Sequence, residues 1–151
     1  MSASVGGTPA DAATASGKRP DVIALYEAAV AAMERAYAPY SSFRVGAALW
    51  SDDGRVFAGC NVENASYPAS LCAERAAIAA AVAAGARGLS CLVIATVARE
   101  PTPPCGICRQ VLAELAPDLE IISRTRGGAE ARWTISTLLP HPFSSPSLGR
   151  P

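Results

Sequence analysis

The chain lacks the features that mark a membrane protein, a nucleic-acid-binding protein or a secreted one. Its 13 basic residues balance 13 acidic ones, so nothing indicates a surface that tracks phosphates or anionic lipids. It has no uninterrupted run of about 18 apolar residues that could span a bilayer. Residues 1–19 are small and polar and lack the apolar centre of a signal peptide. We therefore expect neither a membrane nor a nucleic acid as a partner.

A disulfide framework is not expected either. The five cysteines are an odd number, and two of them form a C-x-x-C unit. Half of the residues are hydrophobic and 17% are charged, which is unlike a small, loop-rich secreted scaffold. Metal or redox use in a reducing cytoplasm is favoured instead. At 151 residues the chain can bury a core, so we expect a disordered tail at 1–19 and one catalytic domain at 20–151.

The hydrophobic pattern after the tail predicts alternating helices and strands. Helices are expected at about 21–37, 72–85 and 103–116, and strands at 43–50, 55–61, 91–97, 119–124 and 131–135. Asp53-Gly54 indicates a hairpin between the first two strands, and Gly127-Gly128 a turn between the last two. The order predicts an α/β fold with three α/β/α layers and a mixed sheet of about five strands.

Two cysteine motifs carry the chemistry. They are Cys72-Ala73-Glu74-Arg75 and, about thirty residues later, Pro104-Cys105-Gly106-Ile107-Cys108. Each is expected at the start of a helix, where free N–H groups and the helix dipole favour thiolates. A structural zinc normally takes four protein ligands, whereas a catalytic zinc takes three and leaves a position for water or substrate. Glu74 can handle the protons of such a water, and Arg75 can donate to the ligand sulfurs.

Simpler interpretations of these residues remain open. The C-x-x-C unit alone could be a thioredoxin-like redox pair, but that motif would need no partner such as Cys72. A closed structural zinc would need Cys60, Cys91 or His141 as its fourth ligand. The first is expected at a strand end, the second in a buried strand and the third in a proline-rich terminal segment. None of the three is a convincing ligand, so the catalytic interpretation is favoured.

The two motifs match the signature of zinc-dependent base deaminases, with Cys in place of His. Further blocks extend the match, at residues 40–49, 59–67, 72–78, 104–112 and 138–140, together with Phe143. On these blocks the chain resembles the small, homotetrameric cytidine deaminases. The resemblance implies one Zn2+ per subunit, bound by Cys72, Cys105 and Cys108. It also implies hydrolytic deamination of free cytidine and deoxycytidine to uridine and deoxyuridine, with ammonia released, in pyrimidine salvage. Zinc-bound hydroxide would attack C4 of cytosine while Glu74 shuttles protons.

The resemblance also implies a set of substrate-binding residues. Asn61 and Glu63 would hold the ribose hydroxyls, Phe43 would pack on the pyrimidine, and the backbone of Ala73 would contact the base edge. Residues lent to a neighbouring subunit's pocket would be Ala65, Tyr67 and Phe143. By residue type alone, Asn61 and Glu63 could be turn residues and Phe43 a core residue. His141-Pro142 departs from the family pattern, which affects the rim of the pocket and not the metal.

Three rival functions follow from the same motifs. One is an aminohydrolase acting on a cytosine-nucleoside antibiotic of the blasticidin type, although Asn61 and Glu63 favour a plain ribose. Another is a nucleic-acid deaminase, which the balanced charge and short chain disfavour. The third is a non-catalytic domain stabilised by a closed zinc site.

Overall fold

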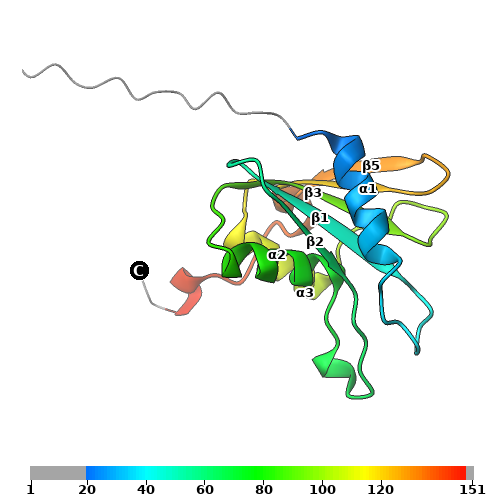
Figure 1. Ribbon diagram of the computed structural model, residues 1–151. Coiled ribbons are helices and arrows are strands. Elements are labelled where there is room, and N and C mark those ends of the chain that lie inside the picture. The colour runs from blue at the N-terminus through cyan, green and yellow to red at the C-terminus, as the bar shows by residue number, and fades with distance from the viewer. Residues whose placement is uncertain (1–19, 149–151) are drawn as a thin grey trace, which may run out of the picture.

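A five-stranded sheet covered by helices on both faces forms the centre of the computed structural model (Figure 1). The structure describes residues 20–148, so the predicted tail at 1–19 lies outside the described residues. The strands are β1 (Val45–Ser51), β2 (Val56–Cys60), β3 (Leu89–Thr96), β4 (Glu120–Arg124) and β5 (Glu130–Thr134). The helices are α1 (Val22–Met33), α2 (Ala73–Ala83), α3 (Gly106–Leu115) and the short α4 (Ile135–Leu138). Two 3-10 turns, η1 (Tyr67–Ala69) and η2 (Ser145–Leu148), complete the described elements.

The sheet has the order β2-β1-β3-β4-β5 and mixes both kinds of pairing. β1 is antiparallel to β2 and to β3, β3 is parallel to β4, and β5 is antiparallel to β4. The parallel pair is joined through α3, as a parallel connection requires a crossover. The predicted α/β class and the mixed five-stranded sheet are confirmed. None of the helices in the described part of the chain is long and apolar enough to cross a membrane.

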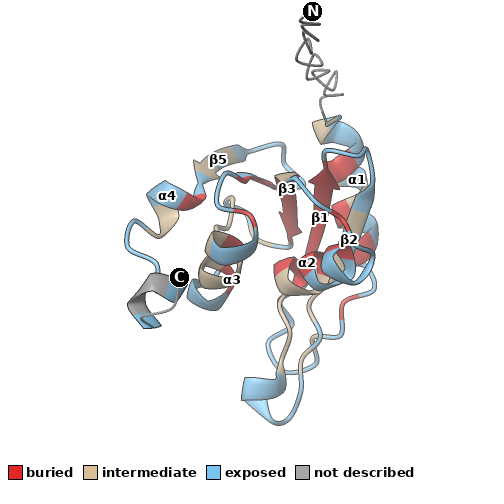
Figure 2. Ribbon diagram, turned by 90° about the vertical axis from the view of Figure 1, so that its left-hand side faces the viewer, coloured by how far each residue is buried: buried red, intermediate tan, exposed pale blue. Residues whose placement is uncertain are grey.

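Helix α1 alone covers one face of the sheet. Its side chains Leu25, Ala29 and Met33 are buried against residues of β1, β3 and β4. The approach is close: a Cβ added at Gly46 in β1 would lie 1.9 Å from the Ala29 carbonyl oxygen. The central strands, buried from both sides, are the red arrows of Figure 2. This face carries none of the cysteine motifs.

Helices α2 and α3 cover the opposite face. Leu49, Ile78, Leu92, Leu112 and Ile121 belong to the core cluster between these helices and the sheet. Gly59 in β2 lets the first turns of α2 lie directly on the strand, because an added Cβ would lie 2.5 Å from Ala77 N and 2.6 Å from Ala73 O. The start of α2 is therefore fixed by a backbone-to-backbone contact.

Two details of the predicted elements were wrong. The first helix ends at Met33 and not near residue 37, because Tyr37 leaves the helix to pair with another segment. Its N–H donates to Asn61 O (3.1 Å) and its carbonyl accepts from Glu63 N (2.8 Å). The short helix α4 was not predicted, and Thr134 caps it together with Thr137. The other element ends fall within three residues of the predicted ones.

Candidate active site

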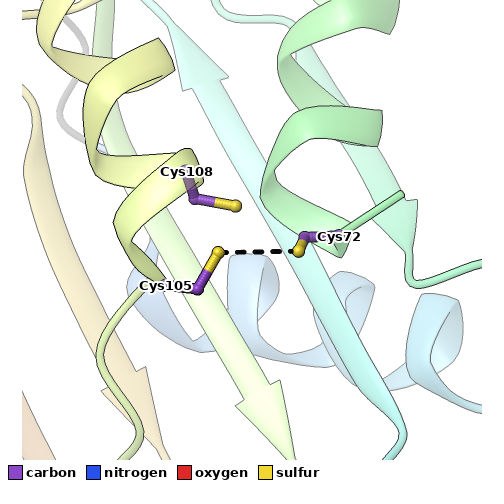
Figure 3. A group of neighbouring side chains, drawn as sticks. All are labelled: Cys72, Cys105 and Cys108. Carbon is purple, nitrogen blue, oxygen red and sulfur yellow. Dashed lines mark hydrogen bonds between the residues drawn. The ribbon is translucent and has the colours of Figure 1, made fainter. Parts of the chain in front are cut away.

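The three cysteines predicted as zinc ligands lie together where α2 and α3 begin (Figure 3). Cys72 is the N-cap residue of α2, Cys105 is the N-cap residue of α3, and Cys108 lies in the first turn of α3. All three sulfur atoms lie within 4.8 Å of one another, and Cys72 Sγ is 3.7 Å from Cys105 Sγ. The cluster therefore joins two motifs that are about thirty residues apart in sequence.

Local backbone geometry explains why these sulfurs converge. At both N-caps the backbone is extended and the side chain makes no capping hydrogen bond, so the sulfur is free to face the other helix. Cys105 and Cys108 are three residues apart at a helix start, which puts both on one face. Within residues 20–148, this is the one group of cysteine, histidine or acidic side chains found close enough to hold a metal ion.

The three thiols of the cluster are a donor set that fits a soft cation. The pKa of Cys72 is lowered to about 5, chiefly by a hydrogen bond with Cys108 and further by Arg75. The pKa of Cys108 is raised far above its usual value, chiefly by that same bond to Cys72 and also by burial. The protein alone thus favours one thiolate and disfavours the next. Three thiolates together need a soft divalent ion, and zinc fits this donor set.

Arg75 lies beside the cluster. Its Nη2 donates to Ser70 O at 2.7 Å and lies 3.9 Å from Cys72 Sγ. Its Nε is buried and has no hydrogen-bond partner among the described residues. The guanidinium is therefore held against the sulfur by a backbone carbonyl, where its charge offsets part of the thiolate charge.

Glu74 is buried, at 5% exposure, in the first turn of α2. Burial raises the pKa of its carboxyl group, because the charged form loses hydration. The residue lines a cavity of about 290 Å³ together with Cys72 and Cys105, which we call the inner cavity. A proton-accepting group and the thiol cluster thus share one space large enough for a small molecule. This arrangement can support acid–base chemistry beside a metal.

Four of the predicted substrate contacts also line the inner cavity: Phe43, Asn61, Ala73 and Glu63. Phe43 is partly exposed in its wall, Ala73 is fully buried beside Glu74, and Asn61 lies where β2 ends. Asn61 is firmly held: its Oδ1 accepts from Val45 N and its Nδ2 donates to Phe43 O, both at 2.8 Å. The amide therefore fixes the chain leading into β1, which includes Phe43.

Glu63 lies at the junction of the inner cavity and a second one. Its carboxylate accepts from Tyr40 N at 2.8 Å, from Ser41 N at 3.2 Å and from the Ser41 hydroxyl. These bonds, with the Ser41 hydroxyl foremost, lower the pKa of Glu63. The second cavity, about 400 Å³, is lined by Tyr40, Tyr67, Glu63 and Cys72 among others, and we call it the outer cavity.

The residues predicted to serve a neighbouring subunit lie away from Glu74. Tyr67 lies in the loop between β2 and α2, which projects from the body of the chain (Figure 1), and meets Tyr40 edge-on with centroids 6.0 Å apart. Ala65 is exposed in the same loop. Phe143 is exposed after α4, beside α3, in a cavity separate from the inner one.

The geometry supports none of the alternative zinc ligands, and it places the C-x-x-C pair in one cluster with Cys72. Cys60, Cys91 and His141 are all described, and none belongs to the sulfur cluster. Cys91 is buried in β3, where burial raises the pKa of its thiol to about 11. All five cysteines are free.

Sequence reasoning gave no role to several residues of the site. Ser41 lines both cavities and binds Glu63, and Tyr40 forms the aromatic contact with Tyr67. Thr96 and Thr102 line the inner cavity with hydroxyl oxygens 3.4 Å apart. The signal available for Tyr40 and Ser41 was their place in the block that starts at residue 40.

A cluster of soft metal ligands, a buried carboxyl group and a shared cavity define a metal-dependent enzyme site. The family model described as the cytidine and deoxycytidylate deaminase zinc-binding region matches residues 21–122. The chain therefore belongs to this family of zinc-dependent deaminases.

Individual relatives agree with the family match. A cytidine deaminase from Halalkalibacterium halodurans is 43% identical over 125 residues, covering 82% of this chain and 95% of the relative. The crystal structure of cytidine deaminase from Burkholderia pseudomallei has a TM-score of 0.77 and 49% identity, covering 80% of this chain and 98% of that one. The crystal structure from Mycobacterium tuberculosis has a TM-score of 0.70 and 39% identity, covering 83% and 99%.

Proposed function

We propose that the chain is a cytidine deaminase that converts free cytidine and deoxycytidine to uridine and deoxyuridine. One water is consumed and one ammonia is released per turnover. The observation that carries the proposal is the buried carboxyl group of Glu74, which lines the same cavity of about 290 Å³ as Cys72 and Cys105 of the cysteine cluster. The similarity to cytidine deaminases over four fifths of the chain supports the same substrate.

We assign the metal to Cys72, Cys105 and Cys108. When bound there, zinc supplies the Lewis acid that makes a water nucleophilic near neutral pH. Glu74 accepts the two protons of the attacking water in turn, and passes the first to the ring nitrogen and the second to the departing amine of cytosine. Its burial keeps the carboxyl group out of bulk water, so the protons pass between substrate and enzyme.

The remaining contacts follow from the walls of the inner cavity. Phe43 would pack on the pyrimidine and the Ala73 backbone would contact the base edge. Asn61 and Glu63 would hold the ribose hydroxyls with the lone pairs and N–H groups that their present bonds leave free. Tight bonds to the backbone support this role, because they fix both side chains before substrate arrives.

The lining residues favour a nucleoside over a nucleotide. Neither cavity has an arginine or lysine among the described residues that line it. The Glu63 carboxylate, whose pKa is lowered by Ser41, is negatively charged at neutral pH. A 5′-phosphate in either cavity would therefore meet the Glu63 carboxylate and no arginine or lysine among the described lining residues. We accordingly propose cytidine and deoxycytidine as substrates, and not deoxycytidylate.

We further propose a homotetramer with shared active sites, in the cytoplasm, serving pyrimidine salvage. The exposure of the Tyr67 and Phe143 rings supports the shared site, because both side chains are accessible to a neighbouring subunit. Five free cysteines are compatible with a reducing compartment. Residues 20–151 would form the single catalytic domain of each subunit.

A deamination assay with zinc quantification tests the proposal. Purified protein carrying one zinc per chain is offered cytidine, deoxycytidine, deoxycytidylate, a blasticidin-type nucleoside and single-stranded polynucleotide. We expect ammonia and uridine or deoxyuridine from the first two substrates. No product from either, with zinc bound normally, would refute the function. A metal spectrum with four protein ligands would favour a non-catalytic zinc domain.

A further inference from the structure

The side chain of Gln110 pairs with both backbone groups of Phe143. Gln110 Nε2 donates to Phe143 O at 2.6 Å, and Gln110 Oε1 accepts from Phe143 N at 3.2 Å. A carboxamide that meets both groups of one residue copies the pattern of a β-bridge and fixes that residue's backbone. The two residues are 33 positions apart, so the pair ties the segment after α4 to α3.

The residue whose backbone is held in this way presents its ring largely to solvent. Phe143 is 61% exposed, and the cavity beside it, about 220 Å³, shares no lining residue with the inner cavity. Ordering the backbone beneath an exposed ring costs conformational entropy without a full gain from burial within the chain. A ring on a fixed backbone is suited to contact a second molecule, because less order has to be imposed at binding.

Helix α3 connects this ring to the metal site. The helix begins at the ligands Cys105 and Cys108, and Gln110 follows two residues after the second. Arg109, between them, donates to Pro104 O at 2.8 Å and to Leu138 O at 3.1 Å, so the start of α3 and the end of α4 are also tied together. One short helix thus sets the position of two ligands and of the Phe143 backbone.

We propose that Gln110 is a positioning residue for substrate binding, which presents Phe143 to the nucleoside pocket of a second copy of the chain. It touches neither substrate nor metal and acts through the Phe143 backbone. The second copy is the occupant because Phe143 lies outside the inner cavity of its own chain. The inference rests on the proposed function and on the proposed shared site.

The test replaces Gln110 with Leu, which keeps the size of the side chain and removes both hydrogen bonds. We expect the KM for cytidine to rise about tenfold, as the loss of two hydrogen bonds would give, while kcat changes less than about twofold. Glu114→Leu is the matched control, because Glu114 lies on the same helix and lines the same small cavity without a hydrogen bond to Phe143. Its KM should stay at the wild-type value.

Two further measurements separate positioning from a general loss of structure. Hydrogen exchange of the backbone amides in residues 139–148 should be faster in Gln110→Leu and unchanged in Glu114→Leu, with zinc content and oligomer mass equal in both. In a Phe143→Ala background, Gln110→Leu should raise KM no further, because the two residues act as one unit. An unchanged KM, a fall in kcat alone, or additive effects in the double variant would overturn the inference. If wild-type protein does not deaminate cytidine, the proposed function fails as well. If wild-type protein is active and only the Gln110 variants depart from these expectations, the inference alone fails.

Discussion

At the inner cavity, Ala73, Glu74 and Thr96 are each at most 5% exposed, whereas at the outer cavity Tyr40 and Tyr67 are 51% and 71% exposed. The inner residues are fixed by the chain's own core, through helix starts that lie on β2 and beside each other. The outer residues belong to loops and a projecting segment. The reactive groups of this chain are therefore positioned by its own core. The rim of the pocket is formed by exposed residues that this core does not cover.

Each region should therefore respond differently to substitution. Changes at the inner cavity should remove chemistry or displace the metal ligands. Changes at the outer cavity should leave the fold intact and alter the binding of the nucleoside. The four predictions that follow run from the largest expected effect to the smallest.

Glu74→Gln tests the inner cavity most directly. The amide keeps the size of the side chain but can no longer accept and return protons, so kcat should fall about 10²- to 10⁴-fold. Zinc content and the unfolding temperature should stay near the wild-type values, because Glu74 is not among the three cysteines of the cluster. Glu114→Gln, an exposed change on α3, should keep full activity. Activity retained in Glu74→Gln would remove this residue from the mechanism.

Gly59→Ala tests how closely α2 must lie on β2. The new Cβ would meet Ala77 N at 2.5 Å and Ala73 O at 2.6 Å, so the start of α2 must move away from the strand. We expect a loss of about 1–3 kcal/mol in the free energy of unfolding. Weaker zinc binding should accompany it, because Cys72 moves with the helix.

Gly106→Ala is the control for this substitution. Gly106 opens α3 between the two ligands, yet a Cβ there would meet no atom within 4 Å. Stability and zinc affinity should therefore be kept. Denaturant titration and zinc competition with a chelator measure both quantities. Equal losses in the two variants would show that the close contact at Gly59 is unimportant.

Asn61→Ala tests a residue that lines both cavities. The substitution leaves the Val45 N–H and the Phe43 carbonyl without their partner, so unfolding should become easier by about 1–2 kcal/mol. The KM for cytidine should rise as well, because Phe43 loses its fixed backbone. Zinc content should not change. If the variant is as stable as the wild type and has a normal KM, Asn61 is only a turn residue and has no role in binding the nucleoside.

The cysteine cluster could be predicted from sequence because its rules are local. The i, i+3 spacing of Cys105 and Cys108 and the position of each motif at a helix start follow from patterns within a few residues. The order of helices and strands was also readable, since hydrophobic periodicity and the Gly turns mark each element. Family resemblance then supplied the substrate.

The contacts around Asn61 and Glu63 could not be predicted in the same way. Each joins residues 16 to 23 positions apart, and which backbone group an amide meets is decided only when the strands are in place. The same holds for the early end of α1. Local propensity favoured a longer helix, but pairing of Tyr37 with Asn61 and Glu63 ended it. Gln110 carried no sequence signal, since its partner Phe143 lies beyond α4.

Tyr67→Ser should have the smallest effect and isolates the rim. The ring is exposed, so its loss should change the free energy of unfolding by no more than about 0.5 kcal/mol. Its edge-on contact with Tyr40 shapes the outer cavity, and a loss of about 0.5 kcal/mol in nucleoside binding corresponds to a KM about 2-fold higher. Val56→Ser is the control, because it also removes exposed apolar surface, in this case on β2. It should leave KM unchanged. A marked loss of stability in Tyr67→Ser would mean that the rim, too, is built into the chain's own fold, and the contrast between the two cavities would disappear.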